Sequence, residues 1–133
     1  MMISLCMIVR DEKKLALKAI NSLRDFVGEK IVVDTGSTDG TQDALAKIGC
    51  KVFEFPWCDD YSAARNFSLS KATGDWILIV DADEKMDLWG LQEMKRRIDS
   101  NPEKNMGFVI TQRHYVLNAY LTNYYRCDGK YPA

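Results

Sequence analysis

The sequence predicts an α/β fold in which a mostly parallel sheet is flanked by helices. Short apolar runs that end abruptly in polar residues alternate with segments whose apolar residues recur every three or four positions. The first pattern is typical of buried parallel strands, and the second of helices that pack on them. In the most pronounced case, the apolar run 76–80 leads directly into Asp81 and Asp83. Strands that alternate with helices predict right-handed crossovers and a three-layer sandwich.

The first part of the chain contains two predicted strands joined by a helix. Residues 3–9 form an apolar run that ends in charged residues, which predicts the first strand. Residues 15–26 have apolar positions on one helical face, and Gly28 is the expected stop of that helix. Residues 31–33 predict the second strand, and a loop of small polar residues follows at 35–41.

The middle of the chain repeats this alternation. A short helix is expected through Ala44 and Ile48, and a third strand at 51–55. The next helix is predicted at 62–72, with Asp59 or Asp60 as its N-terminal cap. The apolar run 76–80 then forms the fourth strand, which we expect to be buried because it is short and rich in β-branched residues.

The last part of the chain is less regular. A helix is expected over 88–98 and a strand over 107–116, while residues 119–133 carry four tyrosines without a clear period. Residues 1–133 are expected to form a single domain. The ending looks like an interrupted loop, so we expect a truncated chain.

Composition excludes several classes of protein. The net charge of −1 offers no electrostatic basis for binding nucleic acid. No apolar run is long enough for a transmembrane segment, and no signal peptide is recognisable. The four cysteines lack CxxC spacing and His114 is the only histidine, so a zinc site is not expected. We therefore expect a cytoplasmic protein with free thiols.

The polar residues after the strands indicate a binding site. The ends at 10–12, 34–41 and 81–84 meet at one edge of a parallel sheet, and ligands bind at its switch point if the first and fourth strands are neighbours. Asp81 and Asp83 would point to the same side of an extended chain, where a hard divalent cation relieves their repulsion. Alternatively, these acids cap the following helix and face water.

Three motifs in this order and spacing resemble the signature of family-2 glycosyltransferases, which have the GT-A fold and use nucleotide-diphosphate sugars. They are the segment 32–41 (VVDTGSTDGT), the segment 64–66 (ARN) and the segment 81–84 (DADE). The likeness covers residues 3 to 84. It implies a Rossmann-like GT-A sandwich that supplies the nucleotide-sugar-binding part of a transferase.

The resemblance also implies roles for individual residues. Asp34 corresponds to the acid that accepts a hydrogen bond from the base, usually from uracil N3–H. Arg65 corresponds to the arginine near the base and diphosphate, Asp83 to the ligand of Mn²⁺ or Mg²⁺, and Asp81 to a contact with the sugar or the metal shell. The remaining expected nucleotide-sugar-binding residues are Ile8, Arg10, Glu12, Gly36 and Ala82. Many relatives carry a tyrosine-asparagine-glutamate run where this chain has Arg10 and Asp11, so an arginine would have to stack on the base.

The implied reaction is an inverting transfer of a sugar, most naturally from UDP, to a hydroxyl of an unknown polysaccharide, lipid or protein acceptor. The catalytic base is expected beyond Ala133, so this chain is expected to bind donor but transfer poorly. Peripheral membrane association and a homodimer through the tyrosine-rich tail are compatible with the sequence. The alternatives are a non-catalytic nucleotide-binding or scaffold domain and a phosphatase of the haloacid dehalogenase class. A sugar-phosphate nucleotidyltransferase would need a glycine-rich loop after the first strand, where this chain has charged residues.

Overall fold

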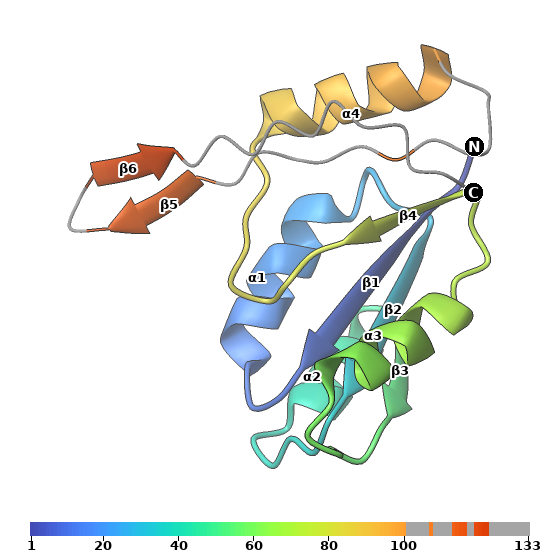
Figure 1. Cartoon of the computed structure of the whole chain (residues 1–133), viewed down its shortest axis with the longest axis vertical. Helices are drawn as coiled ribbons and strands as arrows, with labels where there is room; N and C mark the ends of the chain where they lie inside the picture. Colours follow the sequence, from blue (N-terminus) through green and yellow to red (C-terminus); the bar gives the residue numbers. More distant parts are fainter. Residues whose placement is uncertain (101–106, 108–112, 117–118, 123–133) are drawn as a thin grey trace. The chain divides into compact units, whose positions relative to one another are not determined.

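A computed structural model describes residues 1–100, 107, 113–116 and 119–122 (Figure 1). Its contacts divide the chain into two units, Met1–Ser100 and Asn101–Ala133. In the second unit, β5 (Arg113–Val116) pairs antiparallel with β6 (Ala119–Thr122). Residues 108–112 of the strand expected over 107–116 lie outside the described residues. β6 lies at the start of the segment 119–133, in which the sequence showed no clear period.

The first unit is built on a four-stranded parallel sheet in the order β3-β2-β1-β4. Its strands are β1 (Ile3–Val9), β2 (Glu29–Asp34), β3 (Lys51–Glu54) and β4 (Trp76–Ile79). The chain leaves β1 in one direction to form β2 and β3, and returns to the other side to add β4. The first and fourth strands are therefore neighbours, and the switch point of the sheet lies between them.

Helices cover both faces of this sheet (Figure 1). On one face, α1 (Lys13–Leu23) contacts α2 (Thr41–Lys47), and on the other α3 (Tyr61–Ser70) packs on β1 and β2. Cys6 on β1 marks the α3 face, because its thiol donates to the Ser68 carbonyl. The α/β sandwich predicted from the sequence is confirmed.

The predicted end of the first helix was wrong, whereas one of the two caps predicted for the helix at 62–72 is confirmed. The first helix ends at Leu23 instead of Phe26, because the amides of Phe26 and Val27 both bond back to the Leu23 carbonyl in a turn. Gly28 is not the helix stop but pairs with β1 through the Ile3 carbonyl. The cap of α3 is Asp60, whose carboxylate accepts the amides of Ser62 and Ala63 at 2.8 and 3.1 Å.

The prediction that the fourth strand is buried was only half right. Leu78 is 5% exposed, but Ile77 and Ile79 are 44% and 47% exposed. β4 is the last strand in the order of the sheet, and these two isoleucines lie at register with Ser4 and Cys6 on the face where α3 packs on β1 and β2. After β4, the chain forms α4 (Leu88–Ser100), which agrees with the helix expected there.

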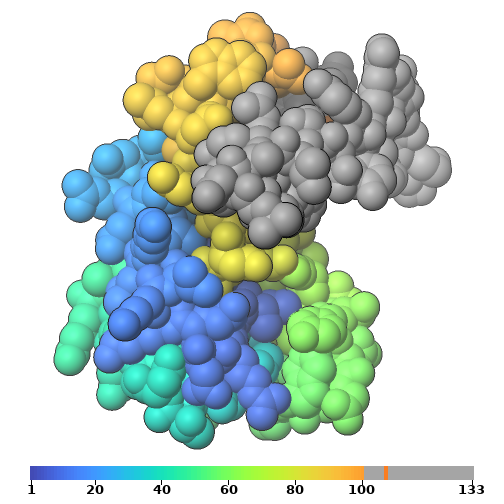
Figure 2. All heavy atoms as spheres, turned by 90° about the vertical axis from the view of Figure 1, so that its left-hand side faces the viewer, coloured from blue at the N-terminus to red at the C-terminus, as the bar shows by residue number. Residues whose placement is uncertain are grey.

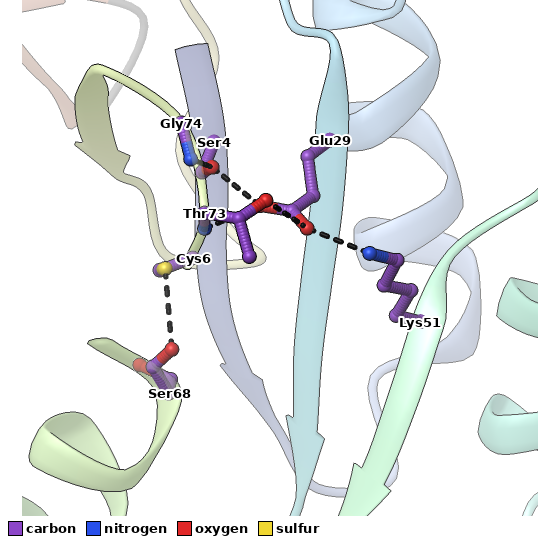
Figure 3. A network of polar contacts seen from close by, with 7 residues as sticks. All are labelled: Ser4, Cys6, Glu29, Lys51, Ser68, Thr73 and Gly74. Carbon is purple, nitrogen blue, oxygen red and sulfur yellow. Dashed lines mark hydrogen bonds and ion pairs between the residues drawn. The ribbon is translucent and has the colours of Figure 1, made fainter. Parts of the chain in front are cut away.

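A buried carboxylate, that of Glu29, joins the strands near their amino ends, opposite the carboxyl ends where the site is predicted (Figure 3). Glu29, only 6% exposed, accepts hydrogen bonds from the Ser4 hydroxyl at 2.5 Å and the Lys51 ammonium at 2.7 Å. The amide and hydroxyl of Thr73 add bonds of 2.9 and 3.0 Å. This network ties β1, β2 and β3 to the segment that leads from α3 into β4.

Gly74 lies against this network and is expected to tolerate no side chain. A Cβ at this position would lie 2.6 Å from the Ser4 hydroxyl oxygen and 2.8 Å from the Met2 carbonyl oxygen. We expect Gly74→Ala to lower the free energy of unfolding by about 1–3 kcal/mol, as overpacking against backbone does. Urea denaturation measures the change, and Gly107→Ala, where an added Cβ meets no atom of the described residues within 4 Å, is the control. Equal stability of the two variants would contradict the prediction.

Candidate functional site

The carboxyl ends of the strands surround a pocket of about 410 Å³. Its lining comes from all four connections at that edge of the sheet: Ile8, Val9, Arg10, Glu12, Thr35, Trp57, Tyr61, Arg65, Asp81, Ala82 and Asp83. In Figure 2 the dark blue end of β1 is visible between the blue start of α1, the green start of α3 and the yellow segment after β4. The pocket therefore lies at the switch point of the sheet.

Most of the site residues predicted from the sequence line this pocket. Only Asp34 and Gly36 are absent from its lining. The sequence reasoning missed Val9, Thr35, Trp57 and Tyr61. Trp57 and Tyr61 could have been predicted from the sequence, because they follow the third strand and therefore lie at the same edge of the sheet as the three motifs.

Asp34 lies at the end of β2 and is 1% exposed. Its Oδ1 accepts the amides of Gly36 and Ser37 at 2.9 and 2.8 Å and the Gln42 side-chain amide at 2.9 Å. Burial alone would raise the pKa of Asp34, but hydrogen bonds from Ser37, Gln42 and Gly36 outweigh it and lower the pKa. The other oxygen, Oδ2, is buried and has no hydrogen-bond partner among the described residues. Because an unpaired buried acceptor is costly, this oxygen is suited to a donor from a ligand.

Glycines shape the loop that holds Asp34. Gly36 has a φ of 116° and Gly40 a φ of 81°, values that favour glycine. Asp39, between them, bonds the Thr41 amide at 2.9 Å and does not line the pocket. Gly36 therefore acts on the site by turning its amide back to Asp34.

The loops after β1 and β2 are bonded to each other. The Asp11 carboxylate accepts the Thr38 amide at 2.7 Å, and the Asp11 amide donates to the Ser37 hydroxyl at 2.8 Å. Asp11 has a φ of 52°, a conformation that aspartate tolerates better than most residues. These bonds hold the neighbours of Asp11, Arg10 and Glu12, at the rim of the pocket.

Arg65 on α3 spans the pocket to the end of β4. Its Nη2 donates to Asp81 Oδ1 at 3.1 Å, while its Nη1 is buried without a hydrogen-bond partner in the part of the chain that the structure describes. A guanidinium with an unused donor suits a phosphate oxygen, which accepts strong charge-assisted bonds. The ion pair itself lies partly in solvent, with side-chain exposures of 30% and 55%, so it contributes little to stability.

Asp81 and Asp83 reach the pocket through a turn and not through extended backbone. The Glu84 amide donates to the Asp81 carbonyl at 3.0 Å, and the Asp81 amide donates to the Glu84 carboxylate at 2.8 Å. The expectation that alternation along a strand aligns the two aspartates was wrong, since β4 ends at Ile79. The Asp83 carboxylate has no hydrogen bond or ion pair with any described residue.

The carboxylates of this turn suit a hard cation, although they do not form a complete cage. Within residues 1–100 and the described parts beyond, no group of three or more His, Cys, Asp or Glu side chains is placed to hold a metal. Asp81 and Asp83 offer oxygen ligands at one pocket, which fits an ion that takes its other ligands from phosphate and water. Asp83 is the freer ligand because Arg65 already bonds one oxygen of Asp81.

Comparison with known proteins now identifies the domain. The family model described as glycosyl transferase family 2 matches residues 4–126. The chain belongs to this family. A TPR repeat-containing protein of Synechococcus elongatus is 47% identical over 97 residues, which are 73% of this chain and 24% of that protein.

Solved structures agree with this family-2 domain. S. aureus TarS 1-349 superimposes with a TM-score of 0.65 at 26% identity, covering 75% of this chain and 33% of TarS. Glucosyl-3-phosphoglycerate synthase from Mycobacterium tuberculosis, in complex with Mn²⁺ and UDP-glucose, has a TM-score of 0.54 at 27% identity, over 62% of this chain and 33% of the synthase. The predicted GT-A fold is confirmed. The chain spans about a quarter to a third of the length of these proteins.

Proposed function

We propose that this domain is the donor-binding part of a metal-dependent, inverting glycosyltransferase that takes a sugar from a UDP-linked donor to an acceptor hydroxyl. The observation that carries the proposal is the convergence of Arg65, Asp81 and Asp83 on one pocket at the switch point. Family membership and the UDP-glucose and Mn²⁺ bound to the mycobacterial synthase support it.

Each residue has a distinct task in this proposal. The unpaired Asp34 oxygen accepts the N3–H of uracil, and the unused Arg65 donor binds a phosphate oxygen. Asp83, with Asp81, would hold Mn²⁺ or Mg²⁺, which when bound neutralises the charge of the departing diphosphate. Ile8, Arg10, Glu12 and Ala82 form walls around the nucleotide. The catalytic base is assigned to none of the described residues.

The proposal is tested by titrating UDP into the chain with and without Mn²⁺. We expect Mn²⁺ to tighten binding at least about tenfold, or 1.4 kcal/mol. Asp83→Ala should remove this enhancement and leave metal-free binding unchanged, because Asp83 has no other described partner. Asp25→Ala changes an exposed acid that follows α1 at the opposite edge of the sheet, and should behave as the wild type.

Other outcomes point to other functions. UDP binding that does not depend on Mn²⁺ would contradict the metal site and leave the proposed contact between Asp34 and the base in place. Metal-dependent UDP binding by a full-length protein that never turns over UDP-sugar would favour a non-catalytic nucleotide-binding or scaffold domain. The family match, in contrast, leaves no support for a haloacid-dehalogenase-type phosphatase.

Three further statements stay predictions of the sequence: a cytoplasmic location, a homodimer, and residues 1–133 as a single domain. The acceptor class also remains a proposal. None of the helices in the described part of the chain combines the length and apolar character needed to cross a membrane.

A further inference from the structure

One side of the pocket is an aromatic wall formed by Trp57 and Tyr61, to which the proposed chemistry assigns no task. The two ring centroids lie 4.6 Å apart with an angle of 69° between the planes. Trp57 is half-buried, whereas Tyr61 is 72% exposed. Two adjoining aromatic rings that are partly exposed at the rim of a pocket form a contiguous apolar patch, which is a common mark of a ligand-binding groove.

The aromatic wall is held in place by the loop before α3. The Trp57 indole N–H donates to Asp59 Oδ1 at 2.8 Å, and Asp59 adopts a left-handed φ of 58°. Asp60 caps α3, of which Tyr61 is the first residue. Both rings are therefore positioned before a ligand arrives, which lowers the entropy cost of binding.

The order of the strands places the aromatic wall on the β2–β3 side of the pocket, the side on which Asp34 ends β2. Trp57 follows β3, which is the neighbour of β2, and the Phe55 amide bonds the Asp34 carbonyl at 2.8 Å. Asp81 and Asp83 follow β4 at the other end of the strand order. The pocket therefore has an aromatic end and a charged end.

The spacing on α3 links these two ends. Tyr61 and Arg65 are four residues apart and lie on the same helix face, separated by about 6 Å along the axis. Arg65 bonds Asp81 at the charged end. A ligand with a flat ring at one end and phosphates at the other can therefore lie along this face of α3, with its sugar between them.

We propose that the Trp57–Tyr61 wall is the stacking platform for the nucleobase and presents its edge to Asp34. This inference rests on the proposed function, because it requires a nucleotide in the pocket. Stacking on an aromatic side chain tolerates different bases, so the platform supplies affinity while Asp34 supplies the choice of uracil. Trp57 and Tyr61 are thus further binding residues for the donor.

The test compares UDP with pyrophosphate, which lacks a base, by titration in the presence of Mn²⁺. We expect Trp57→Ala to weaken UDP binding about tenfold and pyrophosphate binding less than about twofold, with Trp57→Phe close to the wild type. Tyr61→Ala removes an exposed ring at the start of a capped helix, and should also weaken UDP selectively. Trp89→Ala is the matched control, because Trp89 is 75% exposed and does not line the pocket.

The possible failures are distinct. Unchanged UDP affinity in Trp57→Ala and Tyr61→Ala overturns the stacking platform and leaves the proposed function intact. An equal loss of UDP and pyrophosphate shows that the rings support the loop instead of the base, which also overturns the inference. Absence of UDP binding to the wild type overturns the proposed function, and the platform with it.

Discussion

Asp34→Asn is expected to weaken UDP binding about a hundredfold, or 2.7 kcal/mol. The side-chain oxygen of the introduced asparagine can still accept the amides of Gly36 and Ser37, as Oδ1 does now, so the loop should keep its shape. The amide nitrogen would then replace the unpaired Oδ2 and face the N3–H of uracil, so that two donors meet. Calorimetric titration measures the loss.

A second nucleotide separates a lost contact from a damaged fold. Cytosine accepts a hydrogen bond at N3, so the side-chain amide of the Asp34→Asn variant can donate to it, and the ratio of UDP to CDP affinity should fall. The matched control is Asp39→Asn in the same loop, because the Asp39 carboxylate bonds Lys13 and Thr41 outside the pocket. An equal loss of UDP and CDP affinity would contradict the proposed contact to the base.

Glu29→Gln is expected to destabilise the domain by about 3 kcal/mol at pH 7. Burial alone would raise the pKa of Glu29, but hydrogen bonds from Lys51, Ser4 and Thr73 outweigh it and lower the pKa from 4.5 to about 2. A lowered folded-state pKa stabilises the protein above the unfolded-state pKa, and the linkage is worth about 1.4 kcal/mol per pKa unit. For a domain of this size, the melting temperature should fall by about 10 °C.

The pH dependence of this difference provides a second test. The contribution of Glu29 is complete above about pH 4.5 and is lost as the pH falls toward 2, so the gap between wild type and Glu29→Gln should shrink by about half at pH 3. Glu93→Gln is the control. Hydrogen bonds from Arg96 and Arg97 also lower the pKa of Glu93 to about 2. Solvent screens the ion pairs of this cluster, so the substitution should change stability much less than Glu29→Gln does. A gap that is the same at pH 7 and pH 3 would contradict the prediction.

The position of the candidate site was predictable because each motif lies where an apolar run ends. Burial in a parallel sheet requires an uninterrupted apolar strand, and the first polar residue after it must lie at the edge. This rule holds locally for residues 10–12, Asp34 and Asp81. To predict that they meet at one edge of the sheet, we needed only the assumption that the first and fourth strands pair. The structure confirms this pairing.

Partners of polar groups were not predictable in the same way. Arg65 and Asp81 are sixteen residues apart, and Glu29 and Thr73 are forty-four apart. Neither spacing has a periodicity that a sequence can reveal, because these contacts depend on how α3 crosses the sheet. The exposure of the Ile77 and Ile79 side chains has the same cause, because α3 crosses the sheet over β1 and β2.

The sequence alone determined the alternation of strands and helices, the edge of the sheet at which the candidate site lies and the acids placed there, because burial and turn chemistry act on near neighbours. Only the tertiary structure decided that one oxygen of Asp34 is left without a partner among the described residues, that the turn after β4 and not its strand geometry presents Asp81 and Asp83, and that the rings of Trp57 and Tyr61 contact each other beside the pocket. The physical reason is that hydrogen-bond partners and cavities are made by segments that are distant in the chain, and their approach is set by packing of the whole sheet.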